Sequence, residues 1–291
     1  MPVPGGSGWR RLSVLLMALV VLTGAAGCTD DNDAPTAPTP THLSPPVEDG
    51  TMRLTVVFDN YAGSDEYRTG WGFACVAQVA GTTVLFDTGA DGDMLVGNMA
   101  AAGISPEEID MVVLSHIHGD HTGGLDDIVA LNPGVTVYAP PCFPESFGND
   151  VRRRGAEFVE AAPGQRLAEH VLTTGQVDGP VGEQALVLEA AGGLVVITGC
   201  AHPGVDRMVA AAKQRCGGGV GLVFGGFHLG GASRARIEEI ARSLQAMGVQ
   251  RAGPCHCSGD SARQVFAELF GEGYLDVHVG SRLQIPVSGD E

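Results

Sequence analysis

The sequence predicts a fold in which helices flank β-sheets and polar, histidine-bearing turns follow the strands. Short apolar runs typical of buried strands alternate with segments of helical periodicity along most of the chain. At four places such a run ends in a polar turn that carries histidine close to glycine or proline. The hydrophobic content of 44% in 291 residues is ample for the core of such a fold.

Residues 1–27 have the composition of an export signal. Arg10 and Arg11 precede the apolar run 12–22, which is too short to span a bilayer comfortably, and small residues follow. Cys28, directly after Ala-Ala-Gly, resembles the lipidation motif of bacterial lipoproteins, which implies cleavage before Cys28 and a lipid on its thiol. We expect an exported protein, lipid-anchored to the periplasmic or extracellular face of the bacterial cell envelope; the alternative is an ordinary secretory signal.

Residues 28–50 are rich in proline, threonine and aspartate and are predicted to be an extended tether, followed by a folded domain over 51–291. Without residues 1–27 the chain has 15 basic and 34 acidic residues, a net charge of −19. Such a surface repels nucleic acid and anionic headgroups. We expect a small-molecule substrate, no nucleic acid partner, and membrane contact only through the lipid at Cys28.

The first half of the domain is predicted to contain four strands, marked by apolar runs between turn signals, over residues 53–58, 73–80, 83–86 and 111–114. Gly81 separates the second from the third, which indicates a hairpin that delivers Asp87 to the end of a strand. A helix is predicted over 92–102, where Gly103 can end it. Ser105 begins a capped helical turn, with proline next and an acidic residue three positions on.

The second half repeats the order of strand, polar turn and helix. Its strands are predicted from apolar runs over residues 135–138, 186–188, 194–197, 220–224 and 249–252. Its helices are predicted from apolar periodicity over residues 125–131, 205–215, 237–247 and 262–269. Residues 140–165 stay unassigned, and the basic run Arg152–Arg154 is interpreted as a solvated face.

The strand 111–114 leads into the most informative stretch of the chain. Four metal-ligating side chains follow within six residues: His116, His118, Asp120 and His121. Residues two apart in a turning loop point the same way, so His116 and His118 can bind one ion as neutral imidazoles, while Asp120 and His121 face a neighbouring position. This pattern is expected by chance only roughly 0.0006 times in a chain of this composition. Such ligands suit zinc, with iron or manganese as alternatives.

Three more histidines stand where predicted strands end: His202, His228 and His256. Because ligand-bearing loops converge at strand ends, we expect His202 and His256 to join the metal ligands. His228 is left open between a ligand and a group that hydrogen-bonds a substrate anion or protonates a leaving group.

Several segments together resemble the metallo-β-lactamase-fold hydrolases, and within them the methanopterin-pathway ribofuranosylaminobenzene phosphate synthases. The segments that carry the resemblance are residues 59–60, 70–73, 85–89, 114–125, 199–202, 225–229 and 256–257. The resemblance implies an α+β fold, a four-layer αββα sandwich with two divalent metal ions at strand ends between its sheets. It makes His116 and His118 ligands of the first ion, Asp120 and His121 ligands of the second, and Asp87 an acid that braces the loop.

The sequence departs from this family at Cys200, where many members have an aspartate that bridges both ions. If Cys200 takes that place, the third histidine of the first ion is His170 or His202. His170 lies in a polar run without a glycine-bearing turn, so we prefer His202. Cys200 stays open between a thiolate ligand and a buried structural cysteine. Cys255 and Cys257 flank His256 and are expected to alternate away from the metal.

The predicted set of metal ligands indicates a hydrolytic reaction. Two divalent ions about 3.5–4 Å apart lower the pKa of a shared water to near neutrality, and Asp120 can orient that water for attack. We therefore expect a binuclear metal-dependent hydrolase of an ester, lactone or phosphoester. The alternatives are a transferase similar to the pterin-forming synthases, a non-catalytic envelope metal-binding protein, and a di-iron oxidoreductase.

Overall fold

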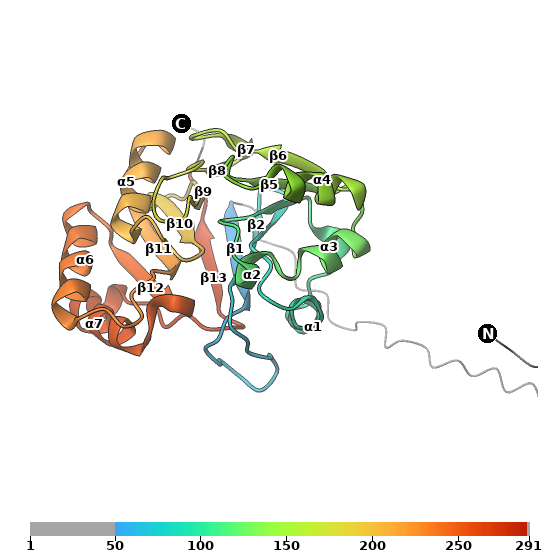
Figure 1. Ribbon diagram of the computed structural model, residues 1–291. Coiled ribbons are helices and arrows are strands. Elements are labelled where there is room, and N and C mark those ends of the chain that lie inside the picture. Colours follow the sequence, from blue (N-terminus) through green and yellow to red (C-terminus); the bar gives the residue numbers. More distant parts are fainter. Residues whose placement is uncertain (1–49, 290–291) are drawn as a thin grey trace, which may run out of the picture. The chain divides into compact units, whose positions relative to one another are not determined.

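A computed structural model describes residues 50–289. The predicted export signal, Cys28 and nearly all of the predicted tether lie outside the described residues. Two sheets form the centre of the fold and helices cover the outer face of each (Figure 1). The α+β four-layer sandwich predicted from the sequence is confirmed.

The first sheet has seven strands in the order β13-β1-β2-β3-β4-β5-β6. They are β1 Thr51–Phe58, β2 Ala74–Val79, β3 Thr82–Phe86, β4 Met111–Val113, β5 Thr136–Ala139, β6 Glu157–Glu160 and β13 Arg282–Pro286. The strands from β3 to β6 are parallel. The carboxyl ends of β3 and β4 therefore lie at the same edge, which places Asp87 beside the histidine-rich stretch.

The second sheet has six strands in the order β12-β11-β10-β9-β8-β7. They are β7 Arg166–Ala168, β8 Val171–Thr173, β9 Leu186–Leu188, β10 Leu194–Thr198, β11 Val220–Gly226 and β12 Arg251–Cys255. The last three are parallel to one another. Their carboxyl ends carry the turns that hold His202, His228 and His256, so one sheet edge collects three histidines that are far apart in the sequence.

Seven helices lie in the described part of the chain: α1 Gly92–Ala102, α2 Gly119–Thr122, α3 Leu125–Leu131, α4 Glu145–Arg153, α5 Val205–Cys216, α6 Arg234–Ala246 and α7 Asp260–Phe270. Helix α1 illustrates their local signals, because Asp91 accepts a hydrogen bond from the Met94 N–H at its start and Gly103 ends it with φ of 75°. Among residues 50–289, no helix is both long and apolar enough to cross a membrane.

Three apolar layers hold the sandwich together. One lies between the two sheets and includes Phe86, Ile197 and Phe224. A second packs α1 and α3 on the first sheet, and a third packs α5, α6 and α7 on the second (Figure 1). Removing the side chain of one such fully buried phenylalanine typically destabilises a protein by about 3–5 kcal/mol, so the layers fix the edges at which the polar turns meet.

The structure differs from the prediction where the apolar signal is weak. Residues 140–165, left unassigned, contain α4 and β6. Strands β7, β8 and β13 were missed, because they are short or, like β13, exposed at every second residue. Strand β12 begins two residues later than predicted, since Val249 packs in the helix-covered layer instead of pairing. The three arginines at 152–154 are exposed, as predicted.

Candidate metal centre

The carboxyl ends of five strands, two from the first sheet and three from the second, meet at one edge of the sandwich. Residues there adopt a backbone that side chains normally avoid: Asp87, Ala201, His228 and His256 have φ between 48° and 56°. Each such residue costs about 1–2 kcal/mol relative to an ordinary conformation. Backbone strain of this kind is common at functional sites, where the surrounding contacts hold a residue in an unfavourable conformation.

The first ligand group consists of His116, His118 and His202. His116 Nε2 lies 3.1 Å from His118 Nδ1 and 3.2 Å from His202 Nε2. Nitrogen ligands of a tetrahedral ion, bound at about 2.0–2.1 Å, lie roughly 3.3 Å apart. The three rings therefore converge at the spacing that one ion requires, and the residues fit a metal.

The ionisation of this group also suits a metal. Burial and the neighbouring imidazoles hold the pKa of His116 far below its usual range, and they lower that of His202 to about 4. Both rings are therefore neutral at pH 7, the form in which imidazole binds a metal ion.

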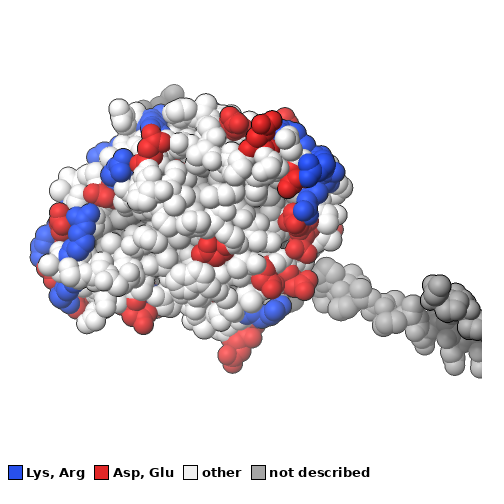
Figure 2. All heavy atoms as spheres, viewed as in Figure 1, with Lys and Arg blue, Asp and Glu red and all other residues white. Residues whose placement is uncertain are grey.

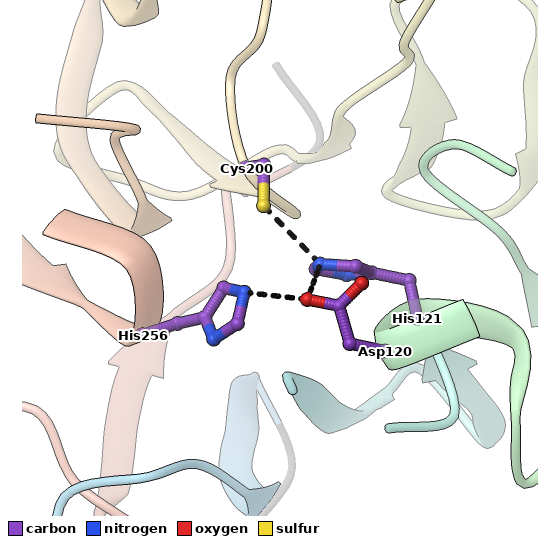
Figure 3. A group of neighbouring side chains, drawn as sticks. All are labelled: Asp120, His121, Cys200 and His256. Carbon is purple, nitrogen blue, oxygen red and sulfur yellow. Dashed lines mark hydrogen bonds and ion pairs between the residues drawn. The ribbon is translucent and has the colours of Figure 1, made fainter. Parts of the chain in front are cut away.

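The second ligand group consists of Asp120, His121, Cys200 and His256 (Figure 3). His121 Nε2 lies 3.2 Å from Cys200 Sγ, and His256 Nε2 lies 3.4 Å from Asp120 Oδ2. His256 Nε2 is buried and has no hydrogen-bond partner within the described chain. A buried nitrogen left without a partner beside a carboxylate and a thiol is explained by a bound cation. The sulfur of Cys200 thus lies among ligand atoms, and not in an apolar environment.

The two groups adjoin each other. The rings of His116 and His121, one from each group, have centroids only 4.2 Å apart. The helical turn α2 provides this arrangement, because His118 precedes it while Asp120 and His121 lie on it. The prediction that His116 and His118 face one position and Asp120 and His121 a neighbouring one agrees with this grouping.

Asp87 lies in neither ligand group and braces both. It is fully buried, and its Oδ2 accepts a hydrogen bond from His121 Nδ1 at 2.7 Å. The same oxygen accepts from Ser115 Oγ at 2.7 Å, and that hydroxyl contacts His116 Nδ1 at 2.8 Å. Burial opposes a charge on His121, but the Asp87 carboxylate outweighs it and raises the pKa of that ring. A more basic imidazole with a fixed tautomer is a better metal ligand.

Asn60 plays the same part for His256. Its Oδ1 accepts a hydrogen bond from His256 Nδ1 at 3.1 Å, and its Nδ2 donates to the His256 carbonyl at 3.4 Å. The second ring nitrogen of His256 is thereby directed toward Asp120. Three of the five histidines in the two ligand groups, His116, His121 and His256, are thus oriented by a polar partner on the outer side of the ring.

Comparison with known proteins shows which domain carries the candidate metal centre. A family model described as the metallo-beta-lactamase superfamily matches residues 72–214, which include the stretch 116–121 and the turn 199–202. These residues form a metallo-beta-lactamase domain, and the chain has the metallo-beta-lactamase fold. The two candidate ligand groups lie at the sheet edge where the resemblance predicted them.

Individual known proteins are similar over most of this chain. One is 7,8-dihydropterin-6-methyl-4-(beta-D-ribofuranosyl)-aminobenzene-5'-phosphate synthase of Methanocaldococcus jannaschii, at 29% identity over 68% of this chain and 82% of that protein. Another, a solved structure, is a metal-dependent hydrolase of the beta-lactamase superfamily, at 26% identity and a TM-score of 0.67, covering 80% of this chain and 98% of that one. A diphosphatase of the PhnP family shares the fold, at 17% identity and a TM-score of 0.60, over 82% of this chain and 98% of that one.

Glu183 is a residue at this metallo-beta-lactamase centre that the sequence did not reveal. It is fully buried and accepts hydrogen bonds from the backbone N–H groups of Cys200, Ala201 and His202 at 2.9, 2.7 and 2.8 Å. Burial raises the pKa of Glu183 to about 7, although these hydrogen bonds oppose the shift. The carboxylate of Glu183 holds the turn that carries Cys200, from the second ligand group, and His202, from the first. No motif surrounds Glu183, so only the folded chain identifies it.

The remaining candidates from the sequence are His170 and the two cysteines that flank His256. His170 lies in the turn between β7 and β8, where its ring faces Glu189 and Ser288 and belongs to neither ligand group. Cys255 is fully buried in the apolar layer between the sheets and belongs to no candidate ligand group. Cys257 also belongs to no candidate ligand group, and its thiol donates to the Cys200 carbonyl at 3.8 Å. A 3₁₀ turn over His256–Ser258 breaks the alternation of an extended strand.

His228 borders the centre without joining the two main groups. Its ring centroid lies 4.3 Å from that of His202, and a ring nitrogen lies within 4.8 Å of the ligand atoms of Cys200 and His202. The side chain is exposed. An interaction in which the protonated ring donates to the Cys257 sulfur raises the pKa of His228 above its usual value, so the ring can carry a proton closer to neutral pH.

Proposed function

We propose that this chain is an exported metal-dependent hydrolase that uses two adjacent divalent ions, zinc before iron or manganese, to cleave an ester, lactone or phosphoester. The observation that carries the proposal is the pair of adjoining ligand groups at one sheet edge, each with at least three donors. A site that only stores metal has no need of the exposed His228 beside the ligands or of a partly exposed Asp120.

In this proposal His116, His118 and His202 hold the first ion, and Asp120, His121 and His256 hold the second, with the Cys200 thiol beside them. Two such ions, when bound, supply a water acidic enough to attack near neutral pH and polarise the oxygen of the substrate. Asp87, Asn60 and Glu183 keep the ligand side chains in position, so that binding requires little rearrangement.

Two side chains of the chain itself complete the proposed reaction. Asp120 keeps about a fifth of its side chain exposed, so its carboxylate can accept a hydrogen bond from the attacking water and orient it. Burial opposes its charge, but His256 and His121 lower its pKa, which keeps it ionised. His228, exposed beside His202, can donate a proton to the leaving group or a hydrogen bond to a substrate anion.

The similarity to the Methanocaldococcus synthase supports a second candidate, a transferase that releases pyrophosphate. Enzymes that bind such highly charged groups surround them with arginine and lysine. Figure 2 shows Lys and Arg at the rim of the face that carries α2, and an acidic patch but no basic side chain near its centre. This distribution favours a substrate of low charge, and therefore the hydrolase over the transferase.

The test combines metal analysis with a chromogenic screen of phosphodiester, phosphomonoester, lactone and β-lactam substrates. The full chain is compared with Asp120→Ala and with His170→Asn, a control histidine outside both ligand groups at which asparagine tolerates the left-handed backbone. We expect about two ions per chain and turnover of one substrate class in the full chain and the control, and about one ion per chain without turnover in Asp120→Ala. A chain that holds metal but hydrolyses none of the substrates would contradict the proposal.

A further inference from the structure

Trp71 is exposed beside the candidate metal centre. Among residues 50–289 only two large apolar side chains are exposed, Trp71 at 59% and Leu131 at 44%. Tryptophan is usually largely buried, and an exposed one is enriched where proteins bind other molecules. Leu131 is the last residue of α3, whereas Trp71 lies beside the candidate metal centre. Only the exposure of Trp71 therefore suggests a role in binding.

The indole lies against a proposed ligand. The centroids of the Trp71 and His256 rings are 4.9 Å apart, and their planes meet at 53°. One side of the indole therefore contacts His256, while 59% of the residue stays exposed to solvent. A molecule held by the second ligand group comes within reach of that open surface.

The backbone holds Trp71 in this place. On one side the Gly70 N–H donates to the Asp59 carbonyl at 3.2 Å, and on the other the Phe73 N–H donates to the Asp120 carbonyl at 3.3 Å. Gly72 has φ of 147°, and a Cβ there would lie 2.5 Å from the same Asp120 carbonyl. The segment 70–73 is thus joined to the residues that carry the ligands, and the indole is positioned before any molecule binds, which lowers the entropic cost of using it.

We propose that Trp71 is a substrate-binding residue that stacks on a planar, unsaturated ring next to the group that reacts at the metal centre. Aromatic stacking suits the centre of the face in Figure 2, which carries an acidic patch but no basic side chain, so that a negatively charged substituent would find no basic partner there. The inference rests on the proposed function for the place of the reacting group, and it adds the class of substrate: an aryl or other planar ester, lactone or phosphoester.

A different role for Trp71 makes a different prediction. If the indole only shields His256 from water, removing it weakens metal binding and affects every ligand of the centre to the same degree. If it binds a planar ring, removing it affects ligands with a ring and leaves those without one unchanged. A pair of ligands that share one anionic head therefore separates the two roles.

The experiment measures the affinity of the zinc-loaded full chain for phenylphosphonate and methylphosphonate by calorimetry. We expect phenylphosphonate to bind about threefold to tenfold more tightly than methylphosphonate. Trp71→Ala should remove this preference and leave methylphosphonate binding unchanged, Trp71→Phe should keep the preference in part, and Leu131→Ala should change nothing. Equal affinities in the unaltered chain, a preference that survives Trp71→Ala, or no binding of either compound would overturn the proposal.

Fluorescence gives an independent readout, since the chain has two tryptophans, Trp9 and Trp71. In a Trp9→Phe background the emission comes from Trp71 alone, and phenylphosphonate should shift it while methylphosphonate does not. Neither measurement depends on turnover. If the chain prefers the ring-bearing ligand but hydrolyses no substrate, the proposed function is refuted and the role of Trp71 is supported. If the chain hydrolyses a substrate and Trp71→Ala does not change that rate, the proposed function is supported and the role of Trp71 is refuted.

Discussion

Replacing Glu183 with alanine is expected to destabilise the fold and weaken metal binding together. The substitution removes the acceptor of three buried N–H groups, those of residues 200, 201 and 202. A buried donor left without a partner costs about 1–3 kcal/mol, so the three together predict a loss of roughly 3 kcal/mol or more in the free energy of unfolding. In a domain of this size that corresponds to a fall in Tm of roughly 6–12 °C.

The loss of metal affinity follows from the position of the turn. Cys200 and His202 belong to different ligand groups, and Glu183 fixes the backbone of both. Removing a group that orients a ligand typically lowers metal affinity about 10–100-fold. Glu183→Gln keeps the size of the side chain and one acceptor oxygen, so its effects should be smaller than those of Glu183→Ala.

The assay is thermal unfolding with and without zinc, together with a competition titration against a chelator of known affinity. Glu160→Gln serves as the control, because Glu160 is exposed at the end of the edge strand β6, and it should shift stability by no more than about 0.5 kcal/mol. If Glu183→Ala unfolds and binds zinc like the unaltered chain, the argument that Glu183 holds this turn is refuted.

Three further predictions follow from the same contacts. Asp87→Asn should lower zinc affinity about 10–100-fold by weakening the support of both ligand groups, whereas Asp93→Asn, on the exposed first turn of α1, should leave the chelator titration unchanged. Cys200→Ser should weaken binding of one of the two ions, while Cys142→Ser, at an exposed cysteine, should not; equal metal content in both variants would exclude the thiol as a ligand. The metal-free chain should lose stability as pH rises from about 4.5 to about 7. The folded state raises the pKa of Glu183 to about 7, so in that window it binds more protons than the unfolded state. Urea unfolding at several pH values should find that this pH-dependent part of the free energy of unfolding is absent in Glu183→Gln.

Features that depend on neighbouring residues could be predicted from the sequence. The helix over 92–102 has its cap, its apolar face and its glycine stop within a dozen residues, and it forms with the predicted bounds. The grouping of His116 with His118, and of Asp120 with His121, likewise depends on the geometry of a single loop. Elements whose apolar signal is short or one-sided, such as β7 and β13, could not be predicted because pairing with a neighbouring strand stabilises them.

The sequence by itself determined the set of donor side chains, their position at strand ends and a fold of sheets flanked by helices, since these follow from local patterns of apolar and polar residues; the four-layer arrangement was implied by the family resemblance. Only the tertiary structure decided which distant groups meet. Asn60 orients His256 from 196 residues away, Glu183 holds the turn of Cys200, and Trp71 covers one side of His256. Such contacts arise because two sheets pack face to face and bring the ends of separate strands to one edge, and no periodicity along the chain encodes which side chains face one another there.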